Sequence, residues 1–122
     1  MKKVLLVNDS KFESMILKDM LVSIGYIAGI ADEYDAIEKV QDMRPDYIII
    51  NRVMKEIYGD ELASKIKARF PEIKCILSSC DSISIDDYKN SGIDAVIRTP
   101  VDQYRLKAVL KNVEYLKNDI RK

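Results

Sequence analysis

The chain has 122 residues, of which 48% are hydrophobic and 33% are charged, and its 20 basic residues balance 20 acidic ones. This length suits one domain over residues 1–122, and the balanced charge creates no field that would attract nucleic acid or an anionic membrane. There is no histidine, and two cysteines are too few for a structural zinc site or a disulfide framework. We expect Cys75 and Cys80 to be reduced, largely buried thiols.

The amino terminus does not look like a targeting segment. Between Met1 and Val7 there are only four consecutive apolar residues, which is too short for the hydrophobic part of a secretory signal. Elsewhere no apolar stretch approaches the roughly 18 residues of a membrane-spanning helix. The sequence therefore predicts a cytoplasmic protein.

In chain order, the first predicted element is a strand over Val4–Val7, a continuously apolar run typical of strands that are covered on both faces. A helix follows, in which Ser10 and Glu13 form a capping box at the start and Gly25 suits the position after the end. Apolar residues recur every three or four positions and predict its buried face: Phe12, Ile16, Leu17, Met20, Leu21 and Ile24. The next strand, Tyr26–Ala31, is weaker because small residues interrupt it.

The middle of the chain repeats this alternation. A second helix is predicted from about Glu33 to Met43, and Pro45 limits its length. A buried strand follows over Tyr47–Ile50, and a third helix ends before Pro71. The residues expected to face inward are Ala36, Ile37 and Val40 in the second helix and Leu62, Ala63 and Ile66 in the third.

The last part of the chain contains two more predicted strands, Cys75–Leu77 and Ala95–Ile97. Between them, a short and weakly amphipathic fourth helix is expected over Ile83–Asn90, closed by Gly92. Asp102 is predicted to cap a fifth helix. This helix has the clearest apolar stripe in the chain: Leu106, Val109, Leu110, Val113, Leu116 and Ile120.

Five strand–helix units predict the fold. Strands that alternate with helices pair in parallel through right-handed crossovers. The expected class is α/β, a flavodoxin-like (βα)5 fold with a five-stranded parallel sheet of order 2-1-3-4-5 and helices on both faces. In such sheets, ligands and catalytic groups gather beyond the carboxyl ends of the strands. The residues found there are the candidate site: Asn8, Asp9, Asn51, Ser78, Ser79, Arg98, Thr99 and Pro100.

The order of these residues resembles the receiver domain of two-component response regulators, in particular the chemotaxis receivers, over the whole chain. Asn8 and Asp9 match the acidic pair of that family, and Asn51 matches the aspartate that accepts the phosphoryl group in a phosphorelay. Met54 and Gly59 follow Asn51 by three and eight residues, as the corresponding residues do in the family. The resemblance implies a signal-transduction module.

Other positions match the family less well. Ser78 matches its switch hydroxyl, and Pro100 matches a proline that follows a cis peptide bond. Thr99, however, replaces the family's lysine, and Lys55 replaces a proline. Val96 occupies the position of the switch aromatic, and a valine cannot swing between buried and exposed sites as an aromatic ring does. The resemblance therefore implies a degenerate pseudo-receiver.

These replacements change the chemistry that is expected of the pocket. The carboxamide of Asn51 forms no stable acyl phosphate, so the carboxylate nucleophile is missing. Asp9 is the one retained carboxylate among the family's metal ligands, so we expect no Mg²⁺ and no other cofactor. Thr99 removes the cation that would pair with a phosphoryl group. Either Arg52 or Lys55 pairs with Asp9 in place of a bound cation, or both side chains point to solvent.

The predicted function is a non-enzymatic module that docks a partner protein without aspartyl phosphorylation. The resemblance implies a docking face on the fourth and fifth helices and the fifth strand: Ile83, Ile85, Tyr88, Arg98, Tyr104 and Arg105. Alternatively, Tyr104 closes the hydrophobic core. The expected partner is a signalling protein of unknown identity or a second copy, bound through the fourth and fifth helices, with no direct contact to nucleic acid or membrane.

Two alternatives stay open. One is a phosphorylatable receiver in which Asn51 is an engineered replacement for aspartate, and the other is a small-molecule sensor that uses the emptied pocket. An enzyme of another doubly wound family has little support. No glycine-rich phosphate loop follows the first strand, and the chain has no histidine to act as a general base.

Overall fold

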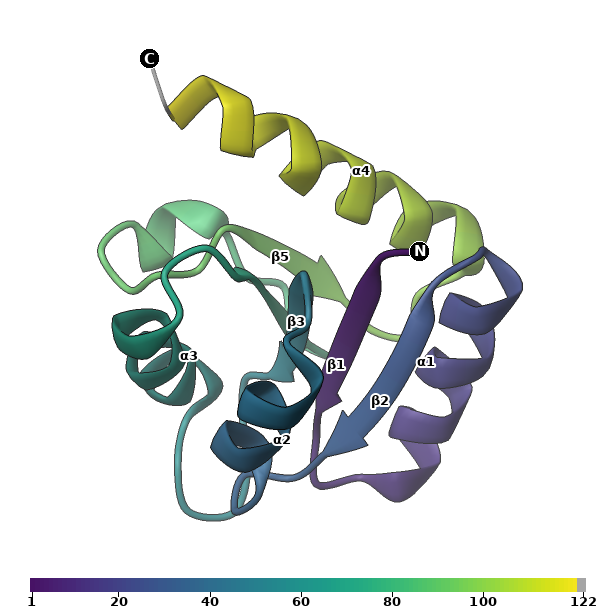
Figure 1. The fold of residues 1–122 in the computed structure, drawn as a ribbon, viewed down its shortest axis with the longest axis horizontal. Helices are drawn as coiled ribbons and strands as arrows, with labels where there is room; N and C mark the ends of the chain where they lie inside the picture. Colours follow the sequence, from purple (N-terminus) through teal and green to yellow (C-terminus); the bar gives the residue numbers. More distant parts are fainter. Residues whose placement is uncertain (121–122) are drawn as a thin grey trace.

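The computed structural model describes the backbone of residues 1–120 and the side chains of residues 1–115. Its centre is a five-stranded parallel sheet of order β2-β1-β3-β4-β5, as predicted (Figure 1). The strands are β1 (Lys3–Val7), β2 (Ile27–Ala31), β3 (Tyr47–Asn51), β4 (Lys74–Ser79) and β5 (Ala95–Arg98). The helices are α1 (Lys11–Ser23), α2 (Ala36–Met43), α3 (Gly59–Arg69) and α4 (Gln103–Ile120).

The helices form two layers, with α1 and α4 on one side of the sheet and α2 and α3 on the other (Figure 1). Successive residues of a strand point to opposite faces. In β1, Val4 and Leu6 pack in the α1–α4 core, whereas Leu5 and Val7 pack in the α2–α3 core. This two-sided burial is the physical reason for the continuously apolar strand runs.

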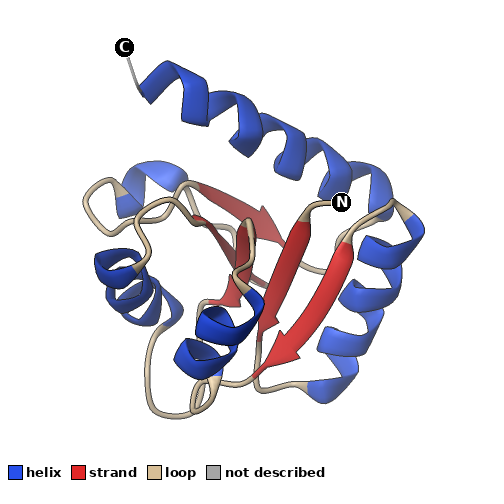
Figure 2. Cartoon of the chain, viewed as in Figure 1, coloured by secondary structure: helices blue, strands red, loops and turns tan. Residues whose placement is uncertain are grey.

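The predicted fourth helix is the main difference between sequence and structure. Over Ile83–Asn90 the chain forms only a short 3-10 helix, η1 (Ile85–Tyr88), between β4 and β5 (Figure 2). Side-chain hydrogen bonds compete with the helix here: the Ser84 hydroxyl accepts from the Asp86 amide at 3.2 Å, and the Ser91 hydroxyl donates to the Tyr88 carbonyl at 2.7 Å. Serine and aspartate disfavour helix interiors for this reason.

The buried face of α1 also differs from the prediction. Leu17 and Leu21 are buried as expected, together with Ser14. Phe12 and Ile16, however, are 77% and 41% exposed, so the predicted face was wrong for these two residues. The helix rests on the sheet through the row that contains Leu17 and Leu21. In the neighbouring row only the first part faces solvent, because Met20 and Ile24 are partly buried against the α1–α4 core. Most inward-facing residues predicted in the other helices are buried: Ala36, Val40, Leu62, Ala63, Ile66, Leu106, Val109, Leu110 and Val113.

Some predictions are modified at the ends of elements. Gly25 follows Ile24, the C-cap of α1, with a φ of +98°, which favours glycine, as predicted. Helix α2 begins at Ala36, three residues later than predicted, because a hydrogen-bonded turn precedes it. Ile37 is partly buried against the core. The side chains of Leu116 and Ile120 lie outside the described part of the chain.

The two cysteines are free thiols with different surroundings. Cys75 is buried in β4, and this burial raises the pKa of its thiol to about 12. Cys80 is exposed just beyond the end of β4, so the expectation of burial was wrong for this residue. Among the helices described, none combines the length and the apolar character that crossing a membrane requires.

Candidate functional site

The carboxyl ends of the strands bring the predicted pocket residues to one edge of the sheet. Asn51 and Ser78 are register partners at the ends of β3 and β4. The Thr99 amide donates to the Ser79 carbonyl at 2.9 Å, which holds the end of β5 beside β4. The residues at this edge are Asn8, Asp9, Asn51, Ser78, Thr99 and Pro100.

Asn8 is buried, and both ends of its side-chain amide bind the protein. Its Oδ1 accepts a hydrogen bond from the Ser10 amide at 2.9 Å, and its Nδ2 donates to Glu13 Oε1 at 2.6 Å. The Ser10 hydroxyl accepts from the Glu13 amide at 3.2 Å, as the predicted capping box requires. The Glu13 carboxylate, however, binds Asn8 and does not complete the box. The oxygen of Asn8 thus faces the backbone of its own loop.

Asn51 lies at the end of β3, where its side chain begins the turn toward α3. Its Nδ2 donates to the Val53 carbonyl at 2.9 Å. The loop then folds back toward the end of β3, where the Gly59 amide donates to the Arg52 carbonyl at 2.7 Å. A Cβ atom added at Gly59 would lie 2.2 Å from the Asn51 carbonyl oxygen, so no other residue fits. A glycine is therefore required eight residues after Asn51 for a steric reason.

The two hydroxyl residues of the pocket are both buried. Ser78 Oγ donates to the Ile50 carbonyl at 3.4 Å, which directs it toward the neighbouring strand. Thr99 precedes Pro100 through a cis peptide bond, as the resemblance predicts. Neutral hydrogen-bonding groups thus occupy the positions at the ends of β4 and β5.

Arg52 forms a bridge between the loops that follow β3 and β4. Its Nε donates to Ser79 Oγ at 3.2 Å, and its terminal nitrogen contacts Asp81 Oδ2 at 2.7 Å. The hypothesis that Arg52 pairs with Asp9 is therefore wrong, because its acidic partner is Asp81. The Arg52 side chain is 26% exposed and that of Asp81 is 67% exposed, so the ion pair alone contributes little to stability. The hydrogen bond to Ser79 fixes the orientation of the Arg52 side chain.

Lys55, the second cation that was considered as a partner of Asp9, has an exposed side chain. Among residues 1–115, no ion pair joins it to Asp9. The structure thus agrees with the alternative in which the Lys55 side chain points to solvent. Asp9 is half-buried, and its carboxylate has no hydrogen bond or ion pair within this part of the chain.

Glu33 is a site residue that the sequence analysis missed. Its Oε1 accepts a hydrogen bond from the Lys55 amide at 3.0 Å, and its Oε2 accepts from the amides of Glu56 and Ile57 at 3.0 and 3.1 Å. One carboxylate thus holds three successive amides of the β3–α3 loop. The sequence contained one signal for this contact. Lys55 stands where the family has a proline, and unlike proline it has a backbone N–H that can donate to a carboxylate.

The turn that carries Glu33 is itself shaped by two aspartates. Asp32 Oδ1 accepts from the amides of Tyr34 and Asp35 at 2.8 and 2.9 Å, and Asp35 Oδ1 accepts from the Asp32 amide at 2.8 Å. Hydrogen bonds from the Asp35 and Tyr34 amides hold the pKa of Asp32 below its ordinary value. This turn connects β2 to α2 and presents Glu33 to the neighbouring loop.

The predicted docking face is only partly exposed. Ile83 and Tyr88 pack against the α2–α3 core, as does Val96 in β5. Tyr104 is 80% exposed, so it does not close the hydrophobic core. The other exposed residues of the predicted face are Ile85, Arg98 and Arg105.

Comparisons with known proteins agree with this geometry. The family model for the response regulator receiver domain matches residues 4–111. Chemotaxis protein CheY of Thermotoga maritima is 30% identical over 117 residues, which cover 92% of this chain and 97% of that protein. The protein-glutamate methylesterase/protein-glutamine glutaminase of the same bacterium is 28% identical over 103 residues, but these cover only 30% of its length. A structure of Vibrio cholerae CheY4 has the same fold, with a TM-score of 0.86 at 24% identity over 93% of this chain and 98% of that one.

Proposed function

Because the chain belongs to the response regulator receiver family, we propose that it is a two-component signalling module that docks a partner protein without aspartyl phosphorylation. The observation that carries this proposal is Asn51 at the end of β3. An acyl phosphate requires a carboxylate nucleophile, and Asn51 offers a carboxamide whose nitrogen is bonded to the Val53 carbonyl. The proposal includes no enzymatic activity.

The proposal also includes the loss of Mg²⁺ binding. Mg²⁺ prefers anionic oxygen ligands in octahedral geometry. Of the three residues that match the family's metal ligands, Asp9 alone is a carboxylate, and the amide oxygen of Asn8 accepts from the Ser10 amide. This donor set does not fit Mg²⁺, and we derive no step through the metal.

We infer that contacts within the protein hold the surrounding loops in one arrangement. Arg52 connects the β3–α3 loop to Ser79 and Asp81 after β4, and Glu33 connects the same loop to the β2–α2 turn. Val96, which occupies the place of the switch aromatic, is packed against the core. These observations support a module that stays in one state.

The proposed docking surface consists of exposed residues near η1, β5 and the start of α4: Ile85, Arg98, Tyr104 and Arg105. Aromatic and arginine side chains are enriched at protein interfaces and often dominate the binding energy. The occupant we propose is a partner signalling protein in the cytoplasm, and a second copy of the chain is the other candidate.

The experiment that tests the loss of phosphorylation is a titration with acetyl phosphate and Mg²⁺, followed by amide chemical shifts. We expect no saturable shift at residues 9, 51, 78 and 99. The control is a triple variant, Asn8→Asp, Asn51→Asp and Thr99→Lys, which restores the family's carboxylates and lysine and should respond. A response of the unmodified chain, centred on these four residues, would overturn the proposal.

The single variant Asn51→Asp separates the proposal from the alternative of an engineered receiver. If one replacement had inactivated an otherwise intact site, reversing it at position 51 alone would bring back phosphorylation. We expect no phosphorylation of this variant, because Asn8 and Thr99 still lack the carboxylate and the cation. Phosphate incorporation measured by mass spectrometry distinguishes the two outcomes.

A further inference from the structure

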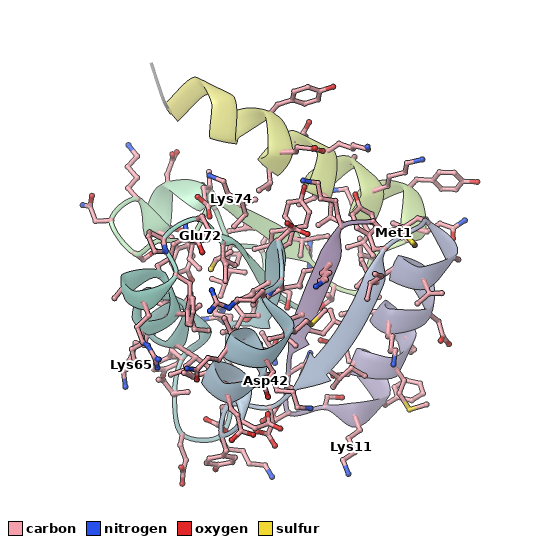
Figure 3. The ribbon with its side chains drawn as sticks, in the orientation of Figure 1. Met1, Lys11, Asp42, Lys65, Glu72 and Lys74 are labelled. Carbon is pink, nitrogen blue, oxygen red and sulfur yellow. The ribbon has the colours of Figure 1, made fainter. Side chains whose placement is uncertain are left out.

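A hollow of about 300 Å³ opens at the edge of the sheet beside the degenerate pocket. It lies between the β1–α1 loop, the β2–α2 turn and the β3–α3 loop, and Ile30 and Ala31 provide its apolar wall. Lys11 projects from the start of α1 at this edge, where β1 and β2 end (Figure 3). The volume is at the lower end of the range for small-molecule sites, which suits a metabolite of a few heavy atoms.

Three polar residues of the hollow are already satisfied by the protein. The amide of Asn8 binds Ser10 and Glu13. The carboxylate of Asp32 accepts two backbone amides, and that of Asp35 accepts a third and pairs with Lys39 at 3.7 Å. These groups shape the walls of the hollow, and both amides bind Oδ1 of Asp32, so its Oδ2 takes no part in these bonds.

Four other polar groups of the hollow have no partner among residues 1–115. They are the Asp9 carboxylate, the ammonium groups of Lys11 and Lys55, and the hydroxyl of Ser14. Ser14 is fully buried, and a buried hydroxyl without a hydrogen bond is unusual in a folded protein. The Ser14 oxygen has no accessible surface, however, so a molecule in the hollow does not reach it, and the groups open to a ligand are those of Asp9, Lys11 and Lys55.

The loops that carry the unpaired groups are held before any ligand arrives. Glu33 fixes the backbone at Lys55 through the amide hydrogen bond at 3.0 Å. The bonds of Asn8 fix the loop that carries Asp9 and leads into α1. Because hydrogen bonds already hold the loops that carry the binding groups, these loops lose less conformational entropy when a ligand binds.

We propose that this hollow binds a small zwitterion with one ammonium and two carboxylate groups, the charge pattern of an acidic amino acid. The ammonium pairs with Asp9, and the carboxylates pair with Lys11 and Lys55. This inference goes beyond the proposed docking function and does not depend on it.

The test is a titration of the ¹⁵N-labelled protein with three probes of similar length: L-glutamate, glutarate and γ-aminobutyrate. Glutarate lacks the ammonium and γ-aminobutyrate lacks one carboxylate. We expect glutamate to shift the amides of residues 8–14, 30–35 and 55 saturably, with an affinity about tenfold higher than that of either other probe, since each loses a charge-assisted contact. Equal affinities for the three probes, or no saturable shift at about 10 mM glutamate, would overturn the proposal.

Variants test the role of each charge. Asp9→Asn should weaken glutamate binding about tenfold and should not weaken glutarate binding, because only glutamate has an ammonium group that pairs with the carboxylate. Lys55→Gln should weaken both. Lys65→Gln on α3 is the matched control, because Lys65 lies on the side of the molecule away from Lys11 (Figure 3). Unequal effects in this pattern support the site, whereas equal effects of Lys55→Gln and Lys65→Gln contradict it.

The outcome is independent of the phosphorylation test, because the titration contains neither Mg²⁺ nor acetyl phosphate. A chain that accepts phosphate but also binds glutamate would disprove only the proposed function. A chain that stays unphosphorylated and does not discriminate among the probes would disprove only the ligand site.

Discussion

Gly59 is the residue whose identity the structure explains most directly. Its Cβ would lie 2.2 Å from the Asn51 carbonyl oxygen, which is a backbone atom and cannot move away cheaply. We expect Gly59→Ala to lower the free energy of unfolding by about 2 kcal/mol, measured by urea denaturation. Gly29→Ala is the control, because its Cβ would meet the flexible Met43 side chain at 3.0 Å, and the loss should be smaller. Equal losses in the two variants would contradict this steric account.

Ser14 provides a second prediction for a single residue. Its hydroxyl is buried without a partner, and removing such a group relieves a desolvation penalty. Ser14→Ala should therefore raise the free energy of unfolding of the ligand-free protein by about 1 kcal/mol. Ser78→Ala should have the opposite effect, since the Ser78 hydroxyl donates to the Ile50 carbonyl. If thermal denaturation shows that both variants are destabilised, the Ser14 hydroxyl has a partner.

Among the loops between the elements, the one from β3 to α3 depends on a residue from another loop. Glu33 accepts hydrogen bonds from the amides of Lys55, Glu56 and Ile57, and all three lengths lie between 3.0 and 3.1 Å. Glu33→Gln replaces one acceptor oxygen by an amide group that faces these donors. We expect amide hydrogen exchange at residues 55–57 to become about tenfold faster, because local opening costs less free energy.

The control for this prediction is Glu38→Gln on α2, an exposed residue with no hydrogen bond or ion pair in the described part of the chain. Its exchange rates at residues 55–57 should equal those of the unmodified protein. If Glu33→Gln also leaves these rates unchanged, the loop is held by its other contacts, such as the bond from the Gly59 amide to the Arg52 carbonyl.

Helix α1 shows why periodicity alone does not identify a buried face. Phe12, Ile16 and Met20 form one row and Leu17 and Leu21 form the next, and both rows are apolar. The second row is fully buried, whereas in the first row Phe12 and Ile16 are exposed and Met20 is partly buried, because the helix crosses the sheet at one particular rotation. The first row borders an apolar hollow of about 240 Å³. A sequence with two adjacent apolar rows contains no information on which of them the tertiary structure covers.

At the scale of the whole molecule, the proposed docking surface can be tested through its effect on partner binding. Tyr104→Ala should weaken binding of any partner that uses the proposed docking surface about tenfold or more, since exposed tyrosines are frequent interface anchors. Tyr115→Ala is the matched control, because Tyr115 is also exposed, at 70%, and lies about three turns further along α4. Isothermal titration with the purified partner measures both affinities. Equal affinities of the two variants would contradict docking at this surface.

The same pair of variants applies to self-association. If the occupant is a second copy, sedimentation of the unmodified chain should show a dimer that Tyr104→Ala dissociates and Tyr115→Ala leaves intact. A dimer unaffected by both changes would use another surface.

The sequence by itself determined the sheet and the line of residues at its edge. Continuous apolar runs separated by helices permit few arrangements other than parallel strands with right-handed crossovers. Five such units suit the order 2-1-3-4-5, one of the few strand orders that this rule leaves. The spacing of Asn8, Asn51 and Ser78 then follows from the strand ends. Local signals also located Gly25 and the capping residue Ser10, because each acts on neighbours a few residues away.

Only the tertiary structure decided which groups at this edge contact one another. The partners Glu33 and Lys55 are 22 residues apart, and Arg52 and Asp81 are 29 apart. Their contacts depend on loop conformations that no periodic pattern encodes. The unpaired hydroxyl of Ser14 likewise depends on how α1 lies on the sheet. Side chains beyond the strand ends have no repeating neighbour, so their pairing is fixed by packing across loops and becomes visible only in the folded chain.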